Sequence, residues 1–177
     1  MRHRIAFVLP TFTTKAVGGY KIIKGYATRL SAMGFDCHII YVHNVVPSEQ
    51  GKICSSNFMA YCQNYLRYLH HKRTTTTAYT EHYYYNYAKI TKHHFVAIFA
   101  TLVFTAFAVK ALPKHCGEKF YFIQGFENWL ADDNIVLDSW RLGLNNIVIS
   151  RWLYNIGKQH AITSYYLPNG LESDKFF

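Results

Sequence analysis

The segments Arg4–Pro10 (RIAFVLP) and Cys37–Val42 (CHIIYV) are two short apolar runs on either side of a stretch with a different periodicity. Each run has the length and composition of a buried β-strand, and Pro10 ends the first because proline cannot donate to a strand ladder. From Tyr20 a helix is expected, because apolar residues share one helical face: Ile22, Ile23, Tyr26, Ala27, Leu30 and Met33. Gly34 stands where such a helix commonly ends. This strand, loop, helix and second strand predict the start of a doubly wound α/β sheet.

The same alternation continues through the rest of the chain. Further strands are expected at Phe95–Phe99, Lys119–Gln124, Asn145–Ile149 and Tyr165–Leu167, and the tyrosine-rich Tyr79–Ile90 is an additional candidate. Helices are expected at Ile53–His71, Thr101–Leu112, Asp133–Arg141 and Arg151–Lys158, with Pro113 stopping the second and Ser150 capping the last. We therefore expect one Rossmann-like domain over residues 1–177, with about six strands in a mostly parallel sheet.

Composition limits the classes of protein and partner. A chain of 177 residues with 50% hydrophobic residues is long and apolar enough for one globular domain, which excludes a disordered chain. The formal net charge is +9, and between His43 and His94 the only acids are Glu49 and Glu81. That segment is either a solvated basic face or a surface for a membrane or another polyanion.

Cysteine usage and hydropathy predict a cytoplasmic protein. The four cysteines form no CxxC pair, and reduced thiols are the simplest interpretation. The first apolar run is too short for a signal peptide. Phe95–Val109 is nearly all apolar but shorter than the roughly 20 residues of a spanning helix, so it is interpreted as a buried strand followed by a buried helix.

Three short motifs are expected at the carboxyl edge of the sheet, where ligands of doubly wound folds bind. Gly18-Gly19 precedes the first helix, and glycines together with free N–H groups allow a phosphate to approach the backbone, although a plain turn is the alternative. Gln124-Gly125-Phe126-Glu127 follows a predicted strand. A glutamine can only exchange hydrogen bonds, whereas Glu127 could orient a hydroxyl or be a salt-bridged surface residue.

The third motif comprises Ser150 and Pro168-Asn169-Gly170. A serine at a strand end before a helix places a hydroxyl and N–H groups at the cleft edge. Asn169-Gly170 could also be a generic turn.

Together these motifs, in this order, resemble the N-terminal domain of GT-B glycosyltransferases of family 4, and the run FIQGFE at residues 122–127 resembles the rhamnosyltransferase-like subgroup. The family has a Gly-Gly loop after the first strand, a strand-end serine before a helix, and a Pro-Asn-Gly crossover toward a second domain. Many members carry a histidine facing the donor sugar where this chain has Gln124. The crossover here extends through Glu172 to Phe177.

The resemblance implies a retaining transferase that passes a sugar from a nucleotide diphosphate sugar to a polysaccharide or lipid-linked acceptor, without a metal or other cofactor. This chain would be its acceptor-side domain; the C-terminal donor-binding domain lies outside the sequence, so the chain alone is expected to be inactive. Gln124 and Glu127 are the expected catalytic residues. The expected substrate-binding residues are Gly18, Gly19, Tyr20, Gly125, Phe126, Ser150, Asn169 and Gly170.

The histidines and acidic residues do not have the spacing of a metal site. His70-His71 and His93-His94 are adjacent pairs that do not share one chelating face, and no Asp-x-Asp motif is present. The alternative to the enzyme is a non-catalytic basic Rossmann-like module that binds a membrane or nucleic acid. In either case residues 43–94 are the expected site of peripheral contact with the inner membrane face.

Overall fold

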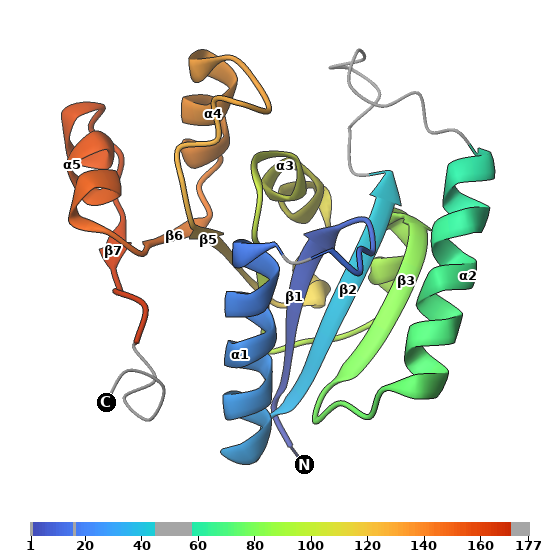
Figure 1. Cartoon of the computed structure of the whole chain (residues 1–177). Coiled ribbons are helices and arrows are strands. Elements are labelled where there is room, and N and C mark those ends of the chain that lie inside the picture. The colour runs from blue at the N-terminus through green and yellow to red at the C-terminus, as the bar shows by residue number, and fades with distance from the viewer. Residues whose placement is uncertain (1, 16, 45–57, 171–177) are drawn as a thin grey trace, which may run out of the picture.

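A computed structural model of the chain describes residues 2–15, 17–44 and 58–170. Its centre is a seven-stranded sheet of order β3-β2-β1-β4-β5-β6-β7, in which every pair of neighbours is parallel (Figure 1). The strands are β1 (Arg4–Pro10), β2 (Asp36–Asn44), β3 (Thr80–Asn86), β4 (Ala97–Ala100), β5 (Glu118–Ile123), β6 (Asn145–Val148) and β7 (Tyr165–Tyr166). The fold is therefore the Rossmann-like doubly wound α/β fold that the sequence predicts.

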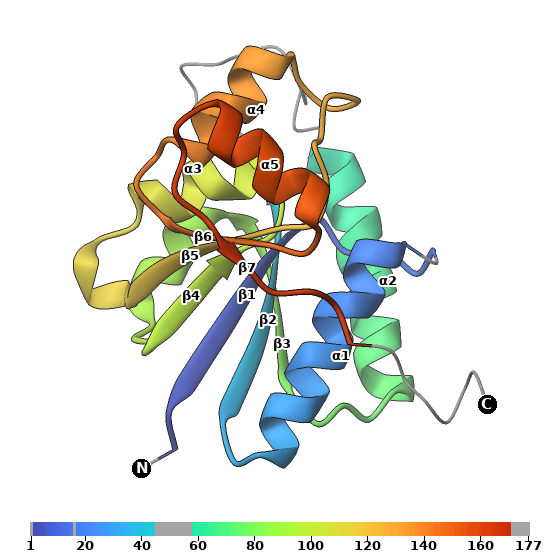
Figure 2. The ribbon, with the colours of Figure 1, turned by 90° about the vertical axis from the view of Figure 1, so that its left-hand side faces the viewer.

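Helices cover both faces of the sheet. The helices are α1 (Gly18–Ala32), α2 (Phe58–Thr74), α3 (Val103–Ala111), α4 (Asp133–Trp140) and α5 (Arg151–Gln159), with short 3₁₀ helices η2 (Tyr87–Lys92) and η3 (Lys114–Cys116). Figure 2 shows α1 and α2 on one side of the strands and α3 to α5 on the other. The chain winds outward from β1 through β2 and β3, then crosses to β4 on the other side of β1. The strand order thus reverses between β1 and β4, where doubly wound folds bind ligands.

Two hydrophobic cores lie on the two faces. The core under α1 and α2 is rich in aromatic residues and includes Phe7, Phe12, Tyr41, Tyr68 and Tyr83. The core under α3 to α5 is mainly aliphatic, with Trp140 as its largest fully buried side chain. Both depend on the alternation of side chains along buried parallel strands.

Several predicted helix ends are confirmed. Gly34 follows α1 with a φ of 97°, the left-handed conformation that favours glycine after a helix. Ser150 is the N-cap of α5, and its Oγ accepts a hydrogen bond from the Leu153 N–H at 3.2 Å. Phe95–Val109 contains β4 and most of α3, and the residues of α3 are largely buried.

Two predictions about the middle of the chain need correction. The sheet has seven strands rather than about six, because the tyrosine-rich segment does form β3. That strand ends at Asn86, before the predicted Ile90, because the Asn86 side chain accepts the Ala88 N–H and starts η2. Of the predicted helix Ile53–His71, residues 53–57 lie outside the described residues, as do 45–52 of the basic segment. Within the described ranges, no helix is both long and apolar enough to cross a membrane.

Candidate functional site

A cavity of about 240 Å³ lies at the switch point between β1 and β4. It is formed where β1, β4 and β5 end and where α1 begins. Its lining residues are Leu9, Pro10, Val17, Gly19, Tyr20, Thr101, Leu102, Gln124, Gly125, Glu127 and Trp129. Five of the ten predicted site residues are among them, contributed by two segments far apart in the sequence.

Gly19 and Gln124 face each other across this cavity. A Cβ atom on Gly19 would lie 3.3 Å from Gln124 Nε2, so glycine leaves the room that the amide occupies. Gln124 Oε1 is buried and has no hydrogen-bond partner. A buried amide oxygen without a partner is costly.

Glu127 is the buried carboxyl group of the cavity, with only 3% of its surface exposed. Its Oε2 accepts the Val103 N–H at 2.6 Å and lies 3.4 Å from the Tyr121 hydroxyl, which donates to it. Burial raises the pKa of Glu127 to about 7, and the hydrogen bonds from Val103 and Tyr121 oppose that rise. The alternative of a salt-bridged surface glutamate is wrong, because the carboxyl group is buried and accepts a hydrogen bond from the Val103 N–H.

The start of α3 is closed to ligands by side chains of the protein itself. Thr105 Oγ1 accepts the N–H groups of Thr101 and Leu102 at 2.9 and 2.8 Å. Glu127 accepts the next one, from Val103. These contacts satisfy N–H groups that a helix start would otherwise offer to an anion. Glu127 thus has a structural task at α3 besides its place in the cavity.

Tyr20 fixes the loop that follows β1. Its hydroxyl donates to the carbonyl oxygens of Pro10 and Thr11, the latter at 2.9 Å. Burial raises the pKa of Tyr20 well above its usual range, with a further contribution from Tyr83. The hydroxyl is therefore committed to the backbone, and Tyr20 contributes to the cavity as a wall.

Trp129 is a cavity residue to which the sequence analysis gave no role. It is 70% exposed although it lines the cavity, so its indole forms an accessible rim. A Cβ atom on Gly125 would lie 3.1 Å from Trp129 Cη2, so the absence of a side chain at Gly125 lets the ring approach. The available signal was its position in the loop after β5, at the ligand-binding edge.

The other predicted residues lie outside this cavity. Gly18 precedes the cavity, and a Cβ atom added to it would have no neighbouring atom within 4 Å. Phe126 packs edge-on against Trp140 with ring centroids 6.1 Å apart. Ser150 caps α5 as described. Asn169 and Gly170 follow β7, the outermost strand, and the rest of the crossover, 171–177, lies outside the described residues.

The histidine pairs are distributed over both faces of the sheet. His71 approaches Glu81, whereas His93 Nε2 lies 2.8 Å from the Tyr84 hydroxyl. Over residues 2–15, 17–44 and 58–170, no group of three or more His, Cys, Asp or Glu side chains could hold a metal ion.

A scan against protein-family models finds no match to this chain. A search of curated proteins finds no relative either. The geometry of the cavity therefore carries the functional argument.

Proposed function

We propose that this chain is the acceptor-side domain of a retaining glycosyltransferase and that a saccharide binds in the switch-point cavity. The observation that carries the proposal is the convergence of Gly19, Gln124 and Glu127 on one cavity with an exposed tryptophan at its rim. A sugar presents hydroxyl groups and an apolar ring face. Gln124 and Glu127 supply hydrogen-bond partners for the hydroxyl groups, and Trp129 supplies a flat apolar surface for the ring face.

The chemistry assigned to each residue follows from its surroundings. Gln124 Oε1, buried without a partner, accepts a sugar hydroxyl. Glu127, with its pKa raised to about 7, can both accept and donate a hydrogen bond near neutral pH and orients the acceptor hydroxyl. The nucleotide diphosphate sugar would be held largely by a second domain, with charge stabilised by N–H groups and basic residues.

Saccharide binding tests this proposal through a matched pair of tryptophans. Trp129 and Trp152 are both largely exposed, at 70% and 61%, but only Trp129 lines the cavity. Oligosaccharides and nucleotide diphosphate sugars are titrated into the protein in a calorimeter. The Trp129→Ala variant should bind the saccharide about tenfold more weakly than wild type, and the Trp152→Ala variant should bind it equally well. Equal binding by wild type and both variants would reject the cavity as the saccharide site.

The second candidate is the basic module without catalysis, at the inner membrane face. One observation favours it: α2 exposes Phe58, Met59 and Leu66 and ends in the basic residues His71, Lys72 and Arg73. A helix with exposed apolar and basic residues suits an anionic membrane surface. Salt-sensitive binding to anionic vesicles, lost in Leu66→Glu, together with no sugar binding would favour this candidate over the enzyme.

A further inference from the structure

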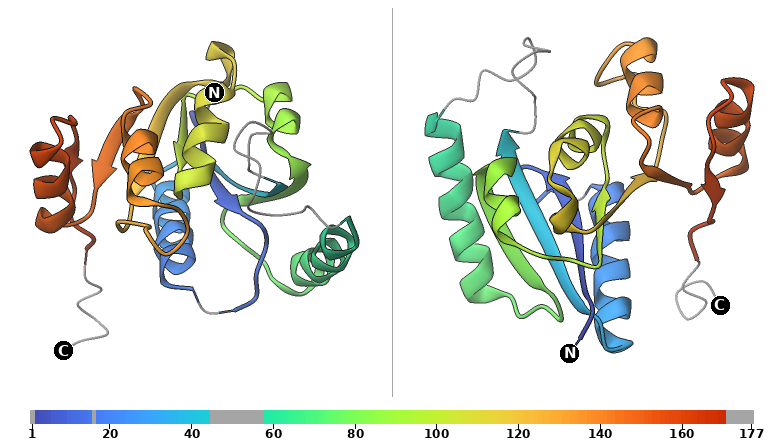
Figure 3. Two further views of the ribbon diagram at one scale, coloured as in Figure 1. Left: turned by 90° about the horizontal axis from the view of Figure 1, so that it is seen from above. Right: turned by 180° about the vertical axis from the view of Figure 1, so that it is seen from behind.

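A second hollow of the molecule lies on the face covered by α1 and α2, next to the switch-point cavity. The segment that follows β1 passes over the sheet between these two helices (Figure 3). Phe12 anchors it, with its ring 5.3 Å from that of Tyr41 and 5.6 Å from that of Tyr68. Two cavities of about 380 and 450 Å³ share two lining residues, Thr14 of this segment and His71 of α2. We name the pair the α1–α2 groove.

The groove is lined by positive charge. Lys15, Lys21 and Lys24 line its α1 side, and Arg67 and His70 line its α2 side. No aspartate or glutamate lines either cavity among the described residues. Neither α1 nor α2 contains an acidic residue anywhere along its length. A concave surface with one sign of charge concentrates its field and attracts ions of the opposite sign.

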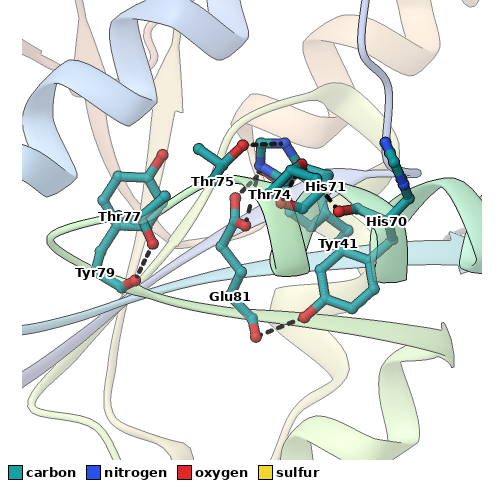
Figure 4. Close-up of polar contacts among 9 residues, drawn as sticks. Tyr41, His70, His71, Thr74, Thr75, Thr77, Tyr79 and Glu81 are labelled. Carbon is teal, nitrogen blue, oxygen red and sulfur yellow. Dashed lines mark hydrogen bonds and ion pairs between the residues drawn. The ribbon is translucent and has the colours of Figure 1, made fainter.

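His71 lines both cavities and approaches a buried carboxyl group. Its Nε2 lies 3.4 Å from Glu81 Oε2, and Glu81 is only 5% exposed. Its Nδ1 lies 3.2 Å from Thr75 Oγ1 (Figure 4). Tyr41 donates its hydroxyl to the other carboxylate oxygen of Glu81 at 2.8 Å, which holds the acid in place. This arrangement orients the imidazole, and Glu81 itself lines neither cavity.

We propose that the α1–α2 groove is a binding site for a small phosphorylated molecule. The volumes of its two cavities fall in the range of sites for nucleotide-sized ligands. Lysine and arginine residues that line a hollow match the charge and the hydrogen-bond acceptors of a phosphate or diphosphate group. The partly exposed Tyr20 ring that lines the α1 side offers an apolar surface for the remainder of such a ligand. A site of this shape favours a small ligand over a flat membrane or an extended strand.

This site is separate from the saccharide site but next to it. Val17 and Tyr20 line both the α1 side of the groove and the switch-point cavity. The lysines, however, line only the groove. Phosphate binding and saccharide binding can therefore fail independently in experiments.

Inorganic pyrophosphate is the probe that tests the groove, titrated into the full chain by calorimetry at low and at moderate salt. The groove variant carries Lys15→Gln, Lys21→Gln and Lys24→Gln. The control variant removes three charges from the other face of the sheet, as Lys110→Gln, Lys114→Gln and Lys158→Gln. The groove variant should bind pyrophosphate about tenfold more weakly or worse, and the control should bind like wild type. Arg67→Gln should lower the affinity by a smaller factor.

The same titrations contain the results that overturn the site. An equal loss in the groove and control variants would show that net charge alone attracts the probe. Absence of saturable pyrophosphate binding by a folded wild type, checked by circular dichroism, would reject the proposal outright. Groove-dependent binding of anionic vesicles or of a single-stranded oligonucleotide, stronger than that of pyrophosphate, would replace the small ligand by a macromolecular surface.

Discussion

Glu81 in β3 and Glu127 in the loop after β5 are two buried carboxyl groups, and their surroundings differ in a way that separates structure from chemistry. They are 5% and 3% exposed. Glu81 is held from two neighbouring elements, by Tyr41 of β2 and His71 of α2. Glu127 is held by the Val103 N–H and the more distant Tyr121 hydroxyl, and it lines a cavity. A buried acid surrounded by protein partners stabilises the fold, whereas one beside open space is available to a ligand.

Removing Glu81 should have the largest effect on stability. Glu81→Ala leaves the Tyr41 hydroxyl and the His71 imidazole without their shared partner, and should lower the free energy of unfolding by about 3–5 kcal/mol. Urea denaturation measures this. The control Glu118→Ala removes an exposed acid and should cost about 1 kcal/mol or less. Equal effects of the two substitutions would contradict the structural role of Glu81.

Glu127 should make stability fall as pH rises. Its pKa is about 7 in the folded protein against an ordinary 4.5, so the folded state holds the proton more tightly. Its stabilising contribution is complete below pH 4.5 and is lost on going up to pH 7, a change of about 3 kcal/mol. Denaturation curves across this range should show a steeper fall for wild type than for Glu127→Gln, which cannot titrate. Parallel profiles would show that the carboxyl group is not desolvated.

His82, in the edge strand β3, should produce the opposite slope. Burial lowers its pKa to about 4, with further contributions from His38 and His93, so folding is favoured by the neutral form. Its contribution is present above pH 6.5 and is lost as pH falls toward 4. Because its side chain is partly exposed, we expect about 2 kcal/mol. The free energy of unfolding of His82→Gln should fall less than that of wild type as the pH is lowered from 6.5 to 4. An equal fall in the two proteins would contradict this assignment.

A methyl group at Gly19 should have the smallest effect on stability but a measurable one on ligand binding. Gly19→Ala places its Cβ 3.3 Å from the Gln124 amide, which must shift within the cavity. The free energy of unfolding should change by about 1 kcal/mol or less, since alanine favours the helix that begins there. Saccharide affinity should fall severalfold, as measured by calorimetry. The control Gly18→Ala enters open space and should leave affinity unchanged.

The sequence predicted the ends of helices better than it predicted the tertiary environment of individual side chains. Gly34 and Ser150 were assigned correctly because a helix end depends on residues within a few positions of it. The predicted end of β3, at Ile90, was too late, because the tyrosine-rich pattern continues past Asn86, whose side chain caps η2. Glu127 was singled out as a motif residue, but its burial depends on the start of α3, which no local pattern reveals.

The α1–α2 groove shows even more clearly that local sequence patterns do not reveal contacts between distant elements. His71 was considered only with its neighbour His70 as a metal ligand, and Glu81 only as one of two acids in a basic segment. Their approach to 3.4 Å requires α2 to pack against β3. Sequence spacing does not encode that contact, because it depends on how a helix and a strand dock.

By itself, the sequence determined the order of strands and helices and the class of fold, since both follow from periodicity and from glycine, proline and capping residues near each element. Only the tertiary structure decided which residues share a cavity. The sheet order places the ends of β1, β4 and β5 side by side, so Gly19, Gln124 and Glu127 converge while Asn169 lies beyond β7. The tertiary structure also gave Glu81 and Glu127 different surroundings, because their burial and their hydrogen-bond partners come from elements distant in the chain.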